Sequence, residues 1–297
     1  MERVDPQALR WLIGVELANQ RKRVGISQAE AGRAVRLSAA MVAHFEVGRY
    51  FPSPEQIASL LRCYGASEEE TERLAALARR ADRSGWLARW VDVIPDWQRT
   101  YLGLEGLASH VVAYAPLVVH GLAQTEAYAA GVIANSARVR PDQAGRLVRL
   151  RMERQRRLLG PEPLRLTMLV EESVLDRPIG GEDAEEVMRG QLALLLDLGA
   201  RDGVEILVLP TALGRHDSLE GQFTMLRFAD PGGGVLARPV VYIEIADDGV
   251  YIHNERQVAQ YARDTEQLRA VAMSAAESAD AIRARLATLA GSAERPG

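Results

Sequence analysis

The sequence has a single cysteine and a single lysine. Cys63 has no second cysteine with which to form a disulfide bond within the chain, and a zinc site built from cysteine ligands is excluded for the same reason. No apolar stretch approaches the roughly 20 residues that a membrane helix needs. The N-terminal residues also lack the apolar segment of a signal peptide. We therefore expect a cytoplasmic protein without a membrane segment.

Signatures of common catalytic and cofactor sites are missing as well. The sequence has no Walker-type phosphate-binding loop, no GxSxG motif and no HExxH motif. Its five histidines are scattered and fit no metal-binding spacing. We expect no cofactor and no metal, and no motif in the sequence points to an enzyme.

What the sequence does have is the length and composition of a globular protein with two domains. It has 297 residues, of which 47% are hydrophobic and 26% are charged. Residues 1–65 hold 9 Lys+Arg and 6 Asp+Glu, a net charge of +3, whereas the remaining residues carry −7, which together give the −4 of the whole chain. A basic N-terminal part on an acidic body favours binding to a polyanion through the N-terminal part.

The segment 27–49 predicts two short helices joined by a tight turn. Ser27 and Glu30 have the spacing of a capping box, so the first helix begins directly after Ser27. Ser38 caps the second helix, which Gly48 ends in a left-handed conformation. This arrangement is typical of a helix-turn-helix, in which the second helix lies in the major groove of DNA.

A longer series of residues in a fixed order and spacing supports this interpretation: Ser27, Gln28, Ser38, Val42, Phe45, Glu46, Gly48, Arg49, Pro52, Ser53 and Pro54. In these residues the segment resembles the Cro/repressor (XRE) class of helix-turn-helix domains, which implies an all-α domain that binds double-stranded DNA. We expect a homodimer, because one small domain buries little surface and two half-sites multiply the affinity. The residues that we expect at the DNA are Gln28, Arg33, Ser38, Ala39, Ala40, His44, Arg49, Arg21 and Arg23.

The expected recognition helix departs from the XRE pattern. Polar side chains usually follow its N-cap, but the outward positions here are apolar: Ala39, Ala40, Met41 and Ala43. Only Ser38 and His44 keep hydrogen-bonding groups, so bidentate contacts to guanine or adenine cannot come from this helix. Two interpretations are open. The domain reads thymine methyl groups and DNA shape, or it has lost specific DNA binding and serves as a scaffold.

Three arginines have more than one interpretation or an unusual position. Arg21 and Arg23 end the predicted helix 7–24, where they contact DNA phosphates or complement the helix dipole as solvated cations. Arg36 replaces the glycine that is usual in the turn, at a cost of roughly 1 kcal/mol if this residue is left-handed.

The rest of the chain predicts a larger α/β (α+β) domain with a mixed sheet. Helical patterns dominate residues 100–160, including a single pattern over 100–115. Strands are expected at 164–170, 204–210, 222–228, 240–246 and 250–252, flanked by helices over 181–199 and 254–290. The expected domains are a helix-turn-helix domain at 1–66, a connecting helix with a Trp-rich linker at 67–100, and an α/β effector or partner-binding domain at 101–290.

Short pieces with a shared order run through residues 85–275: Gly85-Trp86, Tyr101-Leu102, Leu104-Glu105, Gly121-Leu122, Gln124-Thr125-Glu126, Tyr128-Ala129, Arg154-Gln155, Glu171, Leu175, Val187-Met188, Gln191-Leu192, Val208-Leu209-Pro210, Gly214, His216, Gly221, Phe223, Val241-Tyr242 and Glu244. In these pieces the body resembles the C-terminal domain of Scr1-type, toxin–antitoxin antitoxin-like transcriptional regulators of actinobacteria. The resemblance implies a DNA-binding regulator whose body binds a small protein encoded by an adjacent gene, or a small-molecule effector. It supplies no catalytic mechanism.

Two groups of residues are candidates for a ligand or partner site. Trp86 and Trp90 belong to a tryptophan cluster that lines a pocket, or forms a core or subunit contact. The second group lies at expected strand ends and consists of Glu171, Glu172, His216, Glu220 and Glu244. These side chains converge in a cleft that binds a cation or does acid–base work, or they are surface charges that anchor the loop 211–221.

The leading hypothesis is therefore a cytoplasmic, dimeric DNA-binding regulator with a C-terminal domain that senses a ligand or a small protein. Two other classes stay open. The first is an antitoxin-like protein-binding module with degenerate DNA reading. The second is an enzyme that uses the His/Glu cluster of the C-terminal domain.

Overall fold

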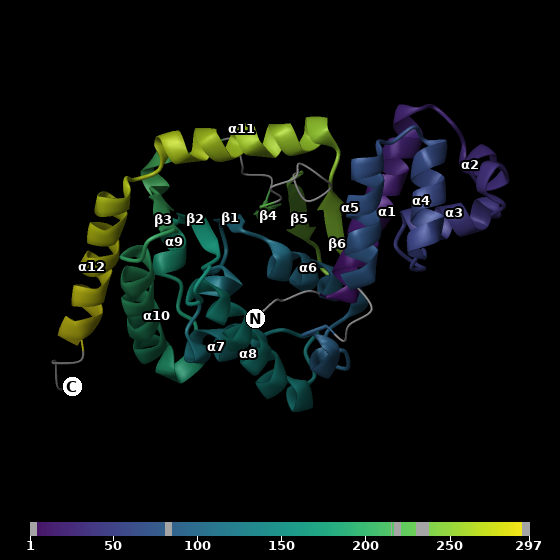
Figure 1. The fold of residues 1–297 in the computed structure, drawn as a ribbon. Coiled ribbons are helices and arrows are strands. Elements are labelled where there is room, and N and C mark those ends of the chain that lie inside the picture. Colours follow the sequence, from purple (N-terminus) through teal and green to yellow (C-terminus); the bar gives the residue numbers. More distant parts are fainter. Residues whose placement is uncertain (1–4, 81–84, 215, 217–220, 230–237, 293–297) are drawn as a thin grey trace. The chain divides into compact units, whose positions relative to one another are not determined.

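The chain forms two compact units in a computed structural model that describes residues 5–80, 85–214, 216, 221–229 and 238–292 (Figure 1). Unit 1 comprises residues 1–108 together with 227–239. Unit 2 comprises residues 109–226 together with 240–297.

Unit 1 is helical, and its helices begin where the sequence places capping residues. Ser27 and Ser53 each form a complete capping box, with Glu30 and Gln56 respectively. The helices of the predicted helix-turn-helix domain are confirmed close to their expected ends. The elements are α1 (Pro6–Arg23), α2 (Gln28–Val35), α3 (Ala39–Glu46), α4 (Pro54–Cys63), α5 (Glu68–Arg80), the 3-10 turn η1 (Ala88–Trp90) and α6 (Asp96–Leu107).

One hydrophobic core holds the helices α1 to α5 together. Its buried members are Leu9, Ile13, Leu17, Ala31, Val42, Phe45, Ile57, Leu60, Leu61, Tyr64, Leu74, Leu77 and Ala78. Gly14 lets α1 lie directly against the end of α3, because a β-carbon at this position would stand 2.4 Å from the carbonyl oxygen of Phe45. The predicted connecting helix is present as α5, which begins after Ser67, ends at Arg80 and packs on α4 and α1.

The single helix expected over residues 100–115 is wrong. The helix α6 ends at Leu107, Ala108 is already extended, and His110–Ala115 forms the strand β1 of unit 2. Five of the six residues of β1 are buried. A strand that is buried on both faces has no alternation of apolar and polar residues, so its periodicity cannot be distinguished from that of a buried helix.

Unit 2 is built on a six-stranded mixed sheet with the order β3-β2-β1-β4-β5-β6. The strands β1, β2 and β3 are parallel neighbours, whereas β5 is antiparallel to both β4 and β6. Every strand expected after residue 163 is confirmed. The strands after β1 are β2 (Arg165–Glu171), β3 (Val204–Leu209), β4 (Phe223–Arg227), β5 (Val240–Glu244) and β6 (Gly249–Ile252).

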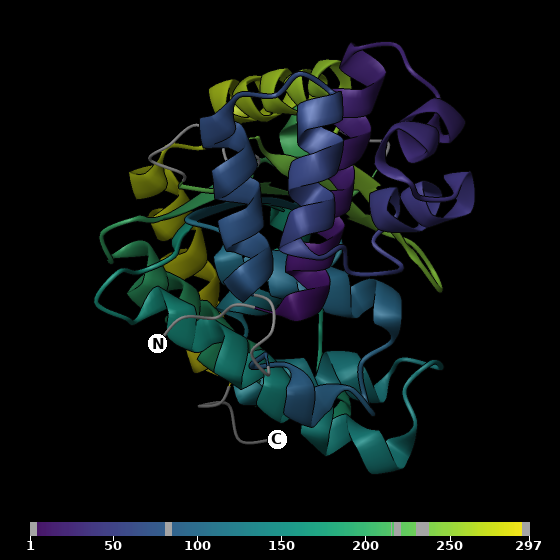
Figure 2. The same cartoon turned by 45° about the vertical axis from the view of Figure 1, so that its right-hand side comes forward.

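Helices cover both faces of this sheet. Figures 1 and 2 show α11 along one side of the strands and α7, α8 and α10 on the other. Val258 and Leu268 of α11 pack on a buried face that includes Tyr114, Leu169 and Phe223. The helical elements are η2 (Gly121–Ala123), α7 (Glu126–Ala134), α8 (Pro141–Gln155), η3 (Arg156–Leu158), α9 (Glu172–Leu175), η4 (Gly181–Asp183), α10 (Ala184–Gly199), η5 (Thr211–Leu213), α11 (Glu255–Val271) and α12 (Ala275–Ser292).

The edge strand β3 is covered by the segment between α11 and α12 and by the first turn of α12. The Met273 backbone N–H donates to the Val208 carbonyl oxygen at 2.8 Å, and the Ser278 hydroxyl accepts from the Val208 N–H at 2.9 Å. These bonds satisfy backbone groups that an edge strand otherwise leaves unpaired. Together the two units confirm the expected fold class, an N-terminal all-α helix-turn-helix region followed by an α/β domain with a mixed sheet. None of the helices in the described parts of the chain has both the length and the apolar character to span a membrane.

Candidate functional site

The turn of the helix-turn-helix is set by local contacts. The Ser38 hydroxyl accepts a hydrogen bond of 3.1 Å from the Met41 backbone N–H and caps α3. Arg36 adopts the left-handed conformation, with φ 59° and ψ 38°, and its N–H donates to the Gly32 carbonyl oxygen. The left-handed conformation costs a residue with a β-carbon roughly 1 kcal/mol, which is the strain that the sequence predicts for Arg36.

The face of α3 that carries Ala39 and Ala40 is exposed and apolar. Ala43 and His44 are half-buried, and Val47, directly after the helix, is 68% exposed. Val42 and Phe45 point the other way, into the core of unit 1. The helix therefore presents small apolar side chains outward and large ones inward.

Arg21 is part of a network inside unit 1. Its guanidinium donates to both carboxylate oxygens of Glu46, from Nε to Oε1 at 2.5 Å and from Nη2 to Oε2 at 2.8 Å, and also to the Ile26 carbonyl oxygen. The exposed fractions of the two side chains are 11% and 5%. Gln28 donates from its amide to the same Oε2 at 2.8 Å. A phosphate contact by Arg21 would break this ion pair, so Arg21 is better described as a residue that joins α1 to α3.

The other expected cations remain at the surface. Arg23 and Arg33 are exposed and form no salt bridge with another described residue. Arg49 is exposed, with its guanidinium carbon 5.9 Å from the ring centre of Tyr50. His44 meets the same ring edge to face, with 4.9 Å between centroids. Arg49, Tyr50 and His44 thus form one group at the C-terminal end of α3.

The two candidate tryptophans lie in unit 1. Trp90 is buried in η1, and the guanidinium carbon of Arg89 stands 5.2 Å from the centre of its ring. Trp86 is half-buried. The role of these residues in binding a ligand or partner stays a prediction, although burial of Trp90 is typical of a core contact.

In unit 2 the structure brings Glu171 and His216 together. His216 Nε2 lies 2.8 Å from Glu171 Oε1, and because a carboxylate only accepts, the imidazole donates. Tyr114, at the end of β1, donates its hydroxyl to the same oxygen at 2.8 Å. The side chains of His216 and Glu171 are 7% and 18% exposed. Tyr114 was missed because its strand was interpreted as a helix.

The electrostatics of this group favour a fixed hydrogen-bond arrangement. Burial raises the pKa of Tyr114, and its hydrogen bond to the Glu171 carboxylate raises that pKa further. The phenol therefore stays protonated and keeps donating at neutral pH. In the described parts of the chain, no three His, Cys, Asp or Glu side chains gather closely enough to hold a metal ion.

Two other acidic residues of the predicted cluster, Glu172 and Glu244, make contacts of their own away from Glu171. Glu172 accepts from the Thr211 N–H at 2.8 Å and pairs with Arg285 of α12, and both contacts lower the pKa of its carboxyl. Glu244 is exposed at the end of β5, which is separated from β2 by β1 and β4. With about 4.8 Å between neighbouring strands, Glu244 and Glu171 are too far apart for direct contact. Glu220 lies outside the described residues.

Sequence reasoning also missed a set of glutamines around η2. Gln124 donates to the Val119 carbonyl oxygen at 2.6 Å, and Gln155 donates to the carbonyl oxygens of Gly121 and Gln124. Gln191, from α10, donates to the Ala123 carbonyl oxygen and accepts from the Thr125 N–H. All three belong to the short pieces that carried the resemblance of the body. They hold the backbone that leads from β1 into α7.

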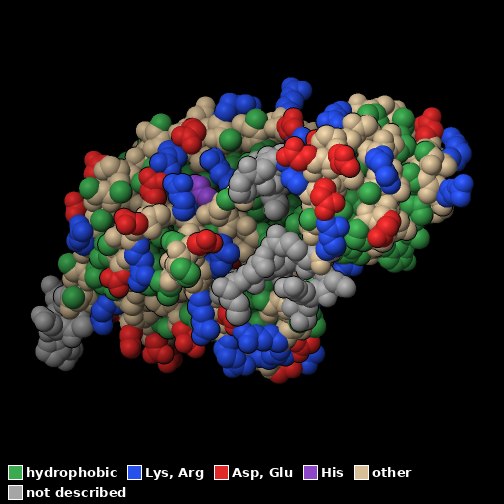
Figure 3. Space-filling view, in the orientation of Figure 1, with side chains coloured by type: hydrophobic (Ala, Val, Ile, Leu, Met, Phe, Trp, Pro, Cys, Tyr) green, Lys and Arg blue, Asp and Glu red, His purple; other side chains and the backbone are tan. Residues whose placement is uncertain are grey.

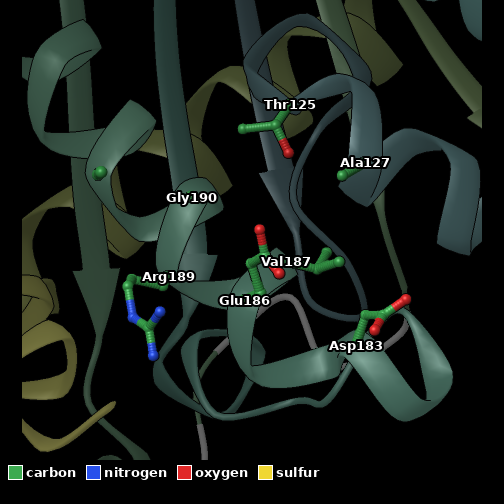
Figure 4. Close-up of a pocket in the computed structure, with 8 residues that line it drawn as sticks. Thr125, Ala127, Asp183, Glu186, Val187, Arg189 and Gly190 are labelled. Carbon is green, nitrogen blue, oxygen red and sulfur yellow. The ribbon is translucent and has the colours of Figure 1, made fainter. Parts of the chain in front are cut away.

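The surface of unit 2 also has an open pocket and a basic helix. An open pocket of about 620 Å³ lies between the start of α7 and α10, where Thr125 and Ala127 face Glu186 and Val187 (Figure 4). Over α8, arginine side chains gather on the face shown in Figure 3. Arg151 of this helix donates to Gln124 at 2.8 Å, so part of the basic character of α8 serves internal packing.

Two capped helices, a left-handed turn and an exposed face on the second helix define unit 1 as a helix-turn-helix, the class of domain that indicates a DNA-binding regulator. Residues 12–74 accordingly match the family model described as Helix-turn-helix domain. Residues 98–284 match the model described as Domain of unknown function (DUF5753), and because this match covers more than half of the chain, the protein belongs to that family. Comparisons with curated proteins and with solved structures give no match.

Proposed function

We propose that this protein is a cytoplasmic transcriptional regulator of the XRE type that binds double-stranded DNA through α2 and α3. The observation that carries the proposal is the exposed face of α3, which Ser38 caps at one end and which Arg49 follows at the other. A helix presented in this way fits the major groove. The resemblance of the body to Scr1-type regulators of actinobacteria supports the same function.

Affinity for DNA would come from the cations around α3. Arg33 and Arg49 lie on either side of the helix in the sequence and are exposed. Exposed arginines gain free energy by releasing counterions from phosphates, whatever the base sequence. Gln28 lies in the first turn of α2, where XRE domains contact the phosphate backbone of DNA. Its side-chain amide, however, already donates a hydrogen bond to Glu46. We assign phosphate contact to Arg33, Arg49 and Arg23.

We further propose that the protein acts as a homodimer. The recognition segment of one copy is short, since α3 has 8 residues. Two copies would contact half-sites about 34 Å apart on one side of the duplex, and their affinities would multiply. Such a dimer would bind a sequence with two-fold symmetry.

The α/β domain is proposed to receive the regulatory signal, from a small molecule or from a small protein encoded by an adjacent gene. The chain passes from β1 to β2 to β3 on one side and then returns to place β4 on the other side of β1. Ligands of open α/β sheets bind at such a reversal, at the carboxyl ends of the parallel strands. Tyr114 and Glu171 lie at these ends, and His216 joins them from the connection between β3 and β4.

Selection from a random double-stranded DNA library tests the DNA-binding proposal. The full-length protein should enrich a two-fold symmetric sequence, and the double variant Arg33→Ala, Arg49→Ala should lose most of this enrichment. The matched control is Arg138→Ala in unit 2, which removes an exposed arginine away from the helix-turn-helix. Equal enrichment by the wild type and the double variant would contradict the proposed interface.

The regulatory role needs a separate comparison of the full chain with residues 1–108. The product of an adjacent gene, or a small-molecule fraction of a cell extract, should change the DNA affinity of the full chain about 5- to 150-fold. The fragment should not respond. Tyr114→Phe, which removes one hydrogen bond to Glu171, should reduce the response of the full chain to a small molecule. An identical response of the fragment and the full chain would place the signal outside the α/β domain.

A second candidate function follows from the composition of α3. Its exposed positions are alanines, which supply no hydrogen bond to a base edge. An antitoxin-like, protein-binding module with degenerate DNA reading would have such a helix. This candidate predicts DNA binding with the same affinity for all sequences and tight binding of the adjacent-gene product.

A further inference from the structure

The outward face of α3 carries a continuous apolar stripe. Ala39 and Ala43 are four residues apart, so they lie above each other on one side of the helix, and the exposed Val47 follows directly after the helix end. Ala40 and His44 form the neighbouring row at the same interval. From Ala39 to Ala43 the stripe is about 6 Å long at 1.5 Å per residue. Its side chains are small, so the helix backbone can approach a base edge closely.

No group on this helix can form a bidentate contact with a base. The only carboxylate of α3 belongs to Glu46, which is buried and held by Arg21 and Gln28. The Ser38 hydroxyl already accepts from the Met41 N–H. His44 is the one remaining polar side chain, and its ring lies against Tyr50. Arginine-to-guanine and glutamine-to-adenine recognition are therefore excluded for α3.

The major groove of DNA offers a single kind of apolar group on its base edges, the 5-methyl group of thymine. We propose that α3 recognises thymine 5-methyl groups, with Ala39, Ala40 and Ala43 as the residues that contact them. This inference rests on the proposed function, since it requires α3 to lie in the major groove. The alanines then contribute specificity through burial of methyl groups, while the exposed arginines supply affinity without regard to sequence.

Replacement of thymidine by deoxyuridine tests the inference directly, because it removes the methyl group and leaves every hydrogen-bonding group of the base in place. A duplex is first enriched by the full-length protein from a random library. It is then synthesised again with deoxyuridine at one thymidine position at a time. Loss of one contacted methyl group should lower the affinity about fourfold. Positions without a methyl contact should show no change.

A pair of variants identifies the residues that make the contact. Ala43→Gly removes a methyl group from the outward stripe and should abolish the effect of deoxyuridine at one position. Ala34→Gly, on the exposed surface of α2, carries the same loss of helix propensity and should leave the deoxyuridine pattern unchanged. Thermal melting of both variants shows whether each is folded.

The outcomes separate this inference from the proposed function. An enriched duplex that keeps its affinity with deoxyuridine at every position would overturn methyl recognition and leave DNA binding intact. The same holds if Ala43→Gly keeps the full deoxyuridine pattern. Failure of the protein to enrich or bind any duplex would overturn both proposals.

Discussion

Arg21 and Glu46 join the end of α1 to the last residue of α3 through two hydrogen bonds of 2.5 and 2.8 Å. They are 25 positions apart in the sequence and nearly enclosed. The pair shares its carboxylate with Gln28, the first residue of α2. One carboxylate therefore connects three helices of the helix-turn-helix, and the orientation of α3 depends on it.

The first prediction concerns stability. Arg21→Ala should lower the free energy of unfolding by about 3 kcal/mol, because it leaves the Glu46 carboxylate buried without its partner. The double variant Arg21→Met, Glu46→Leu should regain most of this loss, since no buried charge remains. Urea denaturation of the two variants measures both effects. A stable Arg21→Ala variant that binds all DNA sequences more weakly would instead restore the phosphate role of Arg21.

Arg49 provides the second prediction. Its guanidinium is exposed beyond α3 and pairs with no described carboxylate, so we expect it to contact a phosphate. Arg49→Ala should weaken binding to a similar extent on all sequences and reduce the salt slope of the affinity by about one. Titrations at several salt concentrations, on the enriched duplex and on an unrelated one, measure the slope. A loss confined to the enriched duplex would show that Arg49 reads a base.

The third prediction concerns His44, the main polar side chain on the outward side of α3. His44→Ala should cost about 1 to 3 kcal/mol on the enriched duplex and relax the preference at one base pair. Tyr50→Leu serves as a control, because it removes the ring that His44 contacts and keeps the imidazole. Repeated library selection with each variant gives the preference at every position. An unchanged consensus for His44→Ala would mean that the imidazole does not reach a base.

The fourth prediction is a dependence of stability on pH. The Thr211 N–H and the Arg285 guanidinium lower the pKa of Glu172 in the folded protein below the ordinary value of a glutamate. The unfolded chain then binds the proton more tightly, so this carboxylate stabilises the fold above the unfolded pKa, and the contribution is lost as the pH falls through the folded pKa. Glu172→Gln should be less stable than the wild type by about 1 kcal/mol at pH 7.

This difference between Glu172→Gln and the wild type should narrow as the pH falls from about 5 to about 3. Urea denaturation at a series of pH values measures it. Glu186→Gln is the matched control, because Glu186 is exposed and forms no ion pair with another described residue. A difference that stays constant down to pH 3 would show that the hydrogen-bonded charge of Glu172 does not stabilise the fold.

Local signals made most of unit 1 predictable from the sequence. Ser27, Glu30 and Ser38 act on backbone groups within one turn, so their roles follow from spacing alone. The Arg21–Glu46 pair was not predictable in this way, because neither residue type nor spacing indicates which distant charges meet. The phosphate and base contacts expected of the helix-turn-helix stay predictions.

In unit 2 the strand ends were the informative positions. Convergence of Glu171 and His216 was one of the two alternatives that their positions at strand ends left open, and these two side chains do meet. Glu244 follows the same rule of position but lies on β5, and the order of strands in the sheet cannot be read from strand ends. Tyr114 was hidden because a buried strand lacks the alternation that identifies a strand at the surface.

The close approach at Gly14 has a consequence for how this protein can change its operator during evolution. The backbone of α1 touches the end of α3, with no side chain between them to absorb a shift. The tilt of the recognition helix is therefore set by its contact with α1. Substitutions on the outward face of α3 can alter the base preference while the docking angle stays constant. A larger residue at position 14 would have the opposite effect, because it would change the docking angle of α3 and leave the residues on its outward face unchanged.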